Sequence, residues 1–378
     1  MFGKRIPLFK LFGFSVNIDI SWFILAILIV WSLAKGLFPY YFKGFSNATY
    51  WWMGVGGAIG LFLSIIFHEF CHSLVARHYG LPMKGITLFI FGGVAEMEDE
   101  PPSAKSEFLM AIAGPISSVV LGIILYFAKT GLALTQWSAP TSLTLQYLAW
   151  LNFILAGFNL IPAFPLDGGR VLRSILWSIK DNIQWATRIA SKLGAGFGIF
   201  LIVAGVFSII SGNLIGGIWW ILIGMFIKNA SQMSYNQLLI RRGLEGENVR
   251  HFMKTDPITV PPTITIKQLV DDYFYKYHYK MFPVSADSKL AGCITINQIK
   301  DVPKDQWQYH AVGELVKQCS IDTVVSPDTA AMKALSKMNT TGNTRLLVVE
   351  DDKLVGVVSL KDMLKFLSLK IDLEGDES

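Results

Sequence analysis

One long uncharged segment runs from Leu193 to Ile227 and strongly restricts the possible folds. Its 35 residues include no Asp, Glu, Lys or Arg, whereas one membrane-spanning helix needs only about 20 apolar residues. We therefore expect two spans here, separated by a turn at Ser211-Gly212-Asn213. Hydrophobic residues make up 52% of the sequence, which also indicates a membrane protein over at least part of its length.

Four further apolar segments are long enough to cross a bilayer, so about six spans are expected in total. These four segments cover residues 20–38, 54–78, 108–128 and 143–164, each bound being approximate. Between the second and the third, two short apolar stretches flank Gly92-Gly93 and predict a small β-hairpin.

The second of these segments carries the pattern His-Glu-x-x-His at His68, Glu69 and His72. Positions i and i+4 lie on one face of an α-helix, so both imidazoles can reach one cation. Ionisable side chains inside an apolar span are costly, and such a group is by default a functional-site hypothesis. The pattern predicts a zinc site with Glu69 as the general base. The alternative is a pair of histidines that only pack on a helix.

A catalytic zinc site needs three protein ligands and an open position, so a third ligand is required. Asp167 is one candidate, because Pro162 and Pro165 break the fourth expected span before it, and irregular backbone at membrane depth suits a hydrated pocket. His78 is the other candidate, because it stands at the last position of the longer zinc motif His-Glu-x-x-His-x-x-Gly-x-x-His. Val75, however, stands where that motif has the glycine that lets the chain turn back to the metal. We therefore expect His78 to lie at the membrane interface and not at the metal. For Asp167, the alternative is that it only ends a helix at the interface.

A second motif, N-x-x-P-x-x-x-x-D-G, follows at the end of the fourth expected span. Its residues are Asn159, Pro162, Asp167 and Gly168. Together with His-Glu-x-x-His, it resembles the site-2 proteases, the zinc metalloproteases of regulated intramembrane proteolysis. The resemblance implies that His68, His72 and Asp167 bind one zinc ion, and that Glu69 is the base. It also implies that Asn159 holds the substrate or its oxyanion, and that the substrate is a transmembrane protein.

The chain from about residue 250 contains two similar units, which predict a pseudo-symmetric pair. Their layout resembles tandem CBS domains, which often bind adenine nucleotides such as ATP. The ribose-binding pattern of that family, G-x-x-[ST]-x-x-D, reads Gly356, Ser359 and Asp362 in the second unit. The first unit has Thr295 but Gln298 in place of the acid. The resemblance implies a nucleotide site formed by these residues, and the alternative is a docking or dimerisation module without a ligand.

The expected fold is an α-helical polytopic membrane domain with a small β-hairpin element, followed by a soluble α/β tandem CBS module. The expected parts are a transmembrane metalloprotease domain (1–230), a juxtamembrane linker (231–248), a first CBS domain (249–306) and a second CBS domain with an acidic tail (307–378).

Positive charge is concentrated in the first part of the chain. Residues 1–247 hold 17 Lys and Arg against 11 Asp and Glu, whereas residues 248–378 hold 16 and 17. Six spans put both termini on one side, and if that side is the cytoplasm only Lys35, Lys43 and Lys129 lie on the outer flanks. We therefore expect a multi-pass protein of the cell membrane with both termini and the CBS domains in the cytoplasm. No nucleic-acid partner is expected.

The leading hypothesis is an intramembrane zinc endopeptidase that cuts a transmembrane segment of a substrate protein, with its activity modulated by the CBS domains. Its partners are the substrate, membrane lipid and, through the CBS domains, a second copy of the chain. The alternative is a CBS-regulated divalent-cation transporter or channel that uses the same cluster as an ion site. Transport sites often accompany internal repeats, which the expected spans lack.

Overall fold

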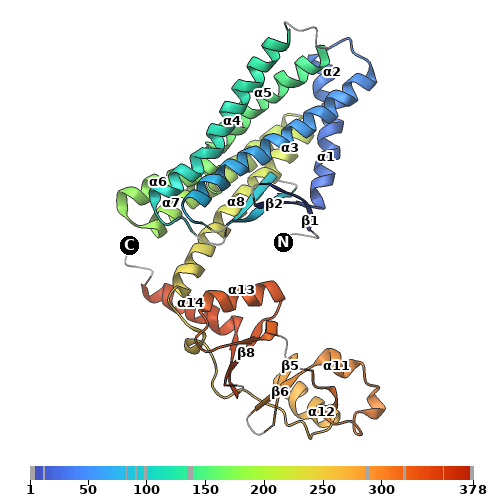
Figure 1. Cartoon of the computed structure of the whole chain (residues 1–378), viewed down its shortest axis with the longest axis vertical. Coiled ribbons are helices and arrows are strands. Elements are labelled where there is room, and N and C mark those ends of the chain that lie inside the picture. The colour runs from blue at the N-terminus through green and yellow to red at the C-terminus, as the bar shows by residue number, and fades with distance from the viewer. Residues whose placement is uncertain are drawn as a thin grey trace. The chain divides into compact units, whose positions relative to one another are not determined.

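The computed structural model describes residues 5–11, 13–81, 83–89, 92–97, 100–133, 139–286, 289–317, 321–351 and 353–374. The chain divides into two compact units, residues 1–236 and 237–378. Figure 1 shows the helices and strands of both units, coloured from blue near the N-terminus to red near the C-terminus.

Helices make up most of the first unit. In chain order they are α1 (Ser21–Ser32), a π-helical turn (Leu33–Leu37), α2 (Phe38–Tyr41), α3 (Asn47–His78), α4 (Ala104–Ala133), α5 (Ala139–Asn159), α6 (Asp167–Lys180), α7 (Ile183–Ile210) and α8 (Leu214–Leu244). Five helical segments are long and apolar enough to cross a membrane; they cover residues 21–41, 47–78, 104–130, 183–210 and 214–244. The prediction of an α-helical polytopic membrane domain is thereby confirmed.

Helix α5 occupies the place of the expected fourth span but is not one of these five segments. Its 21 residues include Gln146 and Asn152, which lower its mean hydropathy. The helix ends at Asn159 rather than near residue 164, because the chain turns ahead of Pro162. In the described part of the chain, length and hydropathy therefore give five spans, close to the expected six.

Helices α7 and α8 are joined by the short turn expected at residues 211–213. Gly212 has a φ of 90° in this turn, a conformation that glycine adopts readily. Between the helices, a Cβ on Gly205 would lie 2.7 Å from the carbonyl oxygen of Gly217. Small residues let two backbones approach this closely, which is a common basis of helix association in membranes.

A four-stranded sheet lies beside α3. Its strands are β1 (Arg5–Leu11), β2 (Phe14–Asp19), β3 (Met83–Phe89) and β4 (Gly92–Met97), in the order β1-β2-β3-β4. The expected hairpin around Gly92-Gly93 is the antiparallel pair β3–β4, and β2 joins it in parallel. Val16 and Ile18 of β2 are buried against Ile66 of α3, so the sheet covers the helix two residues ahead of the His-Glu-x-x-His motif.

The second unit contains a five-stranded sheet and short helices. The strands are β5 (Met281–Ala286), β6 (Lys289–Thr295), β7 (Val324–Val325), β8 (Arg345–Glu350) and β9 (Lys353–Ser359), in the order β5-β6-β9-β8-β7. The helices are α9 (Ile266–Gln268), α10 (Tyr275–Tyr277), α11 (Ile296–Lys300), α12 (Val312–Leu315), α13 (Ala331–Thr341) and α14 (Leu360–Glu374). The hairpins β5–β6 and β8–β9 repeat the same arrangement, which confirms the expected α/β tandem module.

Each half of this module has its own hydrophobic core. Ile240 and Leu244, at the end of α8, pack into the core of the second half, and Lys370 of α14 lies 3.4 Å from both the Gly243 carbonyl oxygen and Glu247. Much of the stretch expected to be a linker is therefore helical, because its apolar side chains have a core to enter.

Candidate metal centre

Two histidines of α3 and the first residue of α6 come together in the first unit. Asp167 Oδ2 lies 3.0 Å from His68 Nε2 and 3.1 Å from His72 Nε2, and the two Nε2 atoms are 3.1 Å apart. These side chains are only 4%, 6% and 14% exposed for His68, His72 and Asp167. Among the described residues, His68, His72 and Asp167 are the His, Cys, Asp or Glu side chains whose ligand atoms lie close enough together to hold one metal ion.

The size of this triangle suits zinc. Tetrahedral zinc has bonds of about 2.0–2.1 Å to nitrogen and oxygen, which places two ligand atoms about 3.3 Å apart. The three separations of 3.0–3.1 Å are slightly shorter than this. A small cation above the triangle would contact all three atoms and keep its fourth position for water or substrate.

The hydrogen bonds of His72 determine which of its nitrogens faces the ion position. Its Nδ1 lies 2.6 Å from the carbonyl oxygen of Met110, which can only accept, so Nδ1 carries the proton. In the neutral imidazole Nε2 then has a lone pair, which faces Asp167 Oδ2 and His68 Nε2. Lone pairs that converge in this way repel each other unless a cation or a proton lies between them. The donor set therefore fits a divalent metal ion.

Helix α4 leaves space for an ion at Gly114. A Cβ on this glycine would collide with the Nε2 atoms of both His68 and His72. Any other residue at this position would therefore place a carbon atom against both of the nitrogens that would bind the ion. Glycine is required here for the close approach and not for a special backbone conformation, since Gly114 lies inside α4 without a positive φ.

A tightly folded loop after α5 brings Asp167 to the histidines. A Cβ on Gly168 would collide with the carbonyl oxygen of Leu160, so the start of α6 packs directly on this loop. The hydroxyl of Ser231, from α8, donates a hydrogen bond to the Phe164 carbonyl oxygen. Asp167 is thereby held at the N-terminus of α6, where the helix dipole favours a carboxylate.

A buried ion pair attaches α6 to α4. Arg173 of α6 donates hydrogen bonds to Glu107 of α4 from Nη2 and, at 2.7 Å, from Nε. Glu107 is fully buried, and Arg170 Nε lies 3.8 Å from the same carboxylate. Breaking a buried pair of this kind costs about 3–5 kcal/mol. The pair therefore helps to hold Asp167, on α6, in register with Gly114, on α4.

Comparison with known proteins identifies the family. A model of peptidase family M50 matches residues 56–136 and 132–205, and a model of the CBS domain matches residues 249–305 and 314–369. A zinc metalloprotease of Methanocaldococcus jannaschii is 32% identical over 364 residues, which cover 96% of each protein. The chain belongs to peptidase family M50, the site-2 proteases.

The chain is also similar to further proteins of this family. The Rip3 protein of Mycobacterium tuberculosis is 30% identical over 366 residues, which are 96% of this chain and 93% of that protein. A solved structure of a site-2 protease from Methanocaldococcus jannaschii is 33% identical, with a TM-score of 0.45, and covers 61% of this chain and 94% of its own. The M50 assignment makes this protein a zinc metalloprotease of the site-2 type, a multi-pass membrane protein with a tandem CBS module.

The other residues predicted for the M50 site lie around the cluster or at helix ends. Glu69 is half-buried on α3, within electrostatic range of both histidines and Asp167, and is not one of the three converging ligands. Asn159 is the half-buried last residue of α5. His78 is exposed at the end of α3 and does not belong to the cluster.

Three contributors to this M50 site come from α4, and sequence reasoning missed two of them. Met110, Gly114 and Ser118 are each four residues apart and therefore share one face of the helix. The third, Gly114, interrupts the expected third span together with Pro115, and this pair also resembles the membrane core of the site-2 proteases. A glycine and a serine at this spacing in an otherwise apolar span are the signal that could have identified this face.

Ser118 provides a direct test of how the M50 histidines are oriented. Its hydroxyl lies 2.8 Å from Nδ1 of His68. Ser118→Ala is expected to weaken zinc binding about 10- to 100-fold, because the imidazole loses the partner that fixes its orientation. Zinc affinity can be measured by competition with a chelator. Ser117→Ala is the matched control, since Ser117 donates to the Gly114 carbonyl of its own helix. Equal zinc affinity in the two variants would contradict the prediction.

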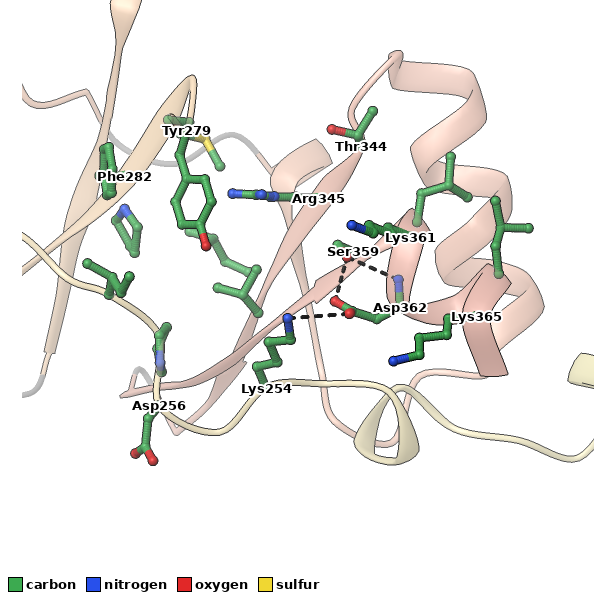
Figure 2. Close-up of a pocket in the computed structure, with 18 residues that line it drawn as sticks. Lys254, Asp256, Tyr279, Phe282, Thr344, Arg345, Ser359, Lys361, Asp362 and Lys365 are labelled. Carbon is green, nitrogen blue, oxygen red and sulfur yellow. Dashed lines mark hydrogen bonds and ion pairs between the residues drawn. The ribbon is translucent and has the colours of Figure 1, made fainter. Parts of the chain in front are cut away.

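The residues predicted to bind a nucleotide in the CBS module are divided between two cavities. Ser359 and Asp362 line a cavity of about 860 Å³, shown in Figure 2. Thr295 lines a second cavity of about 690 Å³. Gly356 lines neither cavity; a Cβ on it would lie 2.8 Å from the carbonyl oxygen of Lys254, so this glycine allows close packing of two backbone segments.

The second cavity has no equivalent of Asp362, as the Gln298 substitution indicated. The hydroxyl and the backbone N–H of Thr295 both donate to Gln298 Oε1 at 2.7 Å. Gln298 Nε2 in turn donates to the Leu315 carbonyl oxygen at 2.9 Å. This amide is thus used in the local fold of the first half, and the cavity beside it has no carboxylate among its lining residues.

Proposed function

We propose that the protein is an intramembrane endopeptidase that cuts a transmembrane segment of another protein, with zinc held by His68, His72 and Asp167. The observation that carries this proposal is the convergence of three ligand atoms from two helices, at separations of 3.0–3.1 Å, within a unit of membrane-spanning helices. The position left for the ion beside Gly114 supports the same proposal.

When bound, zinc polarises the scissile carbonyl and acidifies the attacking water. Glu69 accepts the proton of that water and then delivers it to the leaving amine. His72 and His68 keep their Nε2 atoms directed at the site through their hydrogen bonds to the Met110 carbonyl and the Ser118 hydroxyl. Asn159, the last residue of α5, helps to hold the substrate or its oxyanion.

The orientation of the protein in the membrane is part of this proposal. With α5 counted as the fourth of six spans, the termini and the CBS module lie in the cytoplasm. This arrangement leaves only three basic residues on the outer flanks of the spans, Lys35, Lys43 and Lys129. The family of the chain favours a peptidase over the cation transporter that uses the same cluster.

The adenine nucleotide site is assigned to the larger CBS cavity. Asp362 accepts the ribose hydroxyls, and the apolar side chains of Ile258 and Phe282 contact the base. Four lysine or arginine side chains line the same cavity and match the negative charge of phosphates: Lys254, Arg345, Lys361 and Lys365. Binding there modulates cleavage by the membrane domain.

The test combines metal content with cleavage by the full-length protein in detergent. One zinc per chain is expected, and a chelator should abolish cleavage of a single-span membrane protein, with recovery after zinc is added back. If the purified protein has no zinc and cuts no single-span protein, or if it carries a divalent-cation flux in proteoliposomes that survives chelation of bound zinc, the peptidase proposal is wrong.

A further inference from the structure

The carboxylate proposed to bind ribose already has a partner on each oxygen. The hydroxyl of Ser359 donates to Asp362 Oδ2 at 2.5 Å, within the same turn of the chain. On the other oxygen, Lys254 Nζ lies 3.4 Å from Oδ1. Figure 2 shows both interactions at the edge of the cavity. A ribose diol that binds Asp362 must therefore share this carboxylate with Lys254 or displace the lysine from it.

The main chain of Lys254 is fixed, whereas its side chain is free to move. Its N–H donates to the Val357 carbonyl oxygen at 2.9 Å, and the Val357 N–H donates back at 3.0 Å, which joins this segment to β9. Gly356 permits this close approach. The Lys254 side chain is 73% exposed, so its ammonium group can leave Asp362 by rotation about side-chain bonds alone.

The remaining charges of the cavity favour an anion that the displaced lysine could contact. Lys361 comes directly before Asp362 on α14 and Lys365 follows three residues later, and Figure 2 shows both side chains near it. Arg345 is already engaged, since its guanidinium lies 3.8 Å from the centre of the Tyr279 ring. Lys254 is therefore a cation that can exchange a carboxylate for a phosphate at little structural cost.

From this geometry we infer that Lys254 makes the cavity selective for phosphorylated nucleosides, an inference that rests on the proposed nucleotide site. Without ligand, Lys254 forms an ion pair with Asp362, the carboxylate that would bind ribose. A nucleoside without phosphate must displace the ammonium group and gives it no new partner. A nucleotide displaces it and offers its phosphate in exchange, so the same residue opposes adenosine and favours AMP and ATP.

The test is isothermal titration of the full-length protein in detergent with adenosine, AMP and ATP. Lys254→Met keeps the length of the side chain and removes its charge. It is expected to tighten adenosine binding about 3-fold, because the competing ion pair at this exposed site is weak. It is expected to weaken ATP binding about 10-fold, because a charge-assisted contact to phosphate is lost. Lys333→Met, on an exposed position of α13 outside both cavities, is the control and should change neither.

A second variant separates the outcomes. In an Asp362→Asn background there is no carboxylate to compete for, so adding Lys254→Met should no longer tighten adenosine binding. If Lys254→Met weakens all three ligands in parallel, or changes none, the selectivity inference is wrong while the nucleotide site stands. If the wild-type protein binds none of the three, the nucleotide site is wrong and the inference fails with it.

Discussion

Glu69→Gln is expected to lower the cleavage rate about 10²- to 10⁴-fold while the zinc content stays at the wild-type level. Glutamine has nearly the size of glutamate but cannot take a proton from water. Glu69 is also not one of the three converging ligand groups, so the substitution leaves His68, His72 and Asp167 in place. The measurements are the initial rate on a single-span substrate and the metal content of the same sample.

The matched control for this variant is Glu245→Gln. Glu245 is 62% exposed just beyond the end of α8, where it pairs with Arg242. Removing its charge should change neither rate nor zinc content, because surface pairs contribute little. A Glu69→Gln protein that cuts at the wild-type rate would remove the general base from the mechanism and leave the zinc site without its proposed chemistry.

Gly114→Ala is expected to abolish both zinc binding and cleavage, although it adds only one methyl group. The new Cβ would collide with Nε2 of His68 and of His72, so neither imidazole could keep the position in which it would bind the ion. Because residue 114 precedes Pro115 inside α4, an alanine there also meets the proline ring, so the stability of the variant has to be measured together with its zinc content. Zinc content and thermal unfolding of the purified variant separate loss of the ion from loss of the fold.

Gly196→Ala provides the control for this experiment. Gly196 lies within α7, and a Cβ on it would meet no atom within 4 Å. This variant should keep its zinc and its activity. If Gly114→Ala also keeps both, the ion cannot lie above the triangle of ligand atoms, and another coordination geometry is required.

The CBS module shows how far a repeated motif can be interpreted from sequence. The repeat correctly indicated two similar halves, because strands and helices recur with the same hydrophobic spacing. The sequence suggested one nucleotide site for Thr295 and Asp362 together, whereas the fold places them in separate cavities. The lysine that pairs with Asp362 lies far from it in the chain, so no local pattern could have revealed the contact.

Local sequence determined the long apolar helices, the turn between α7 and α8, and the placing of His68 and His72 on one face, since these depend on hydropathy and on the helical repeat. Tertiary structure decided that Asp167 meets these histidines, because its position depends on a folded loop and on the buried pair between Glu107 and Arg173. It also decided that α4 supplies the space beside the ligands. Contacts between distant segments depend on how those segments pack together, and the sequence of one segment alone does not determine this packing.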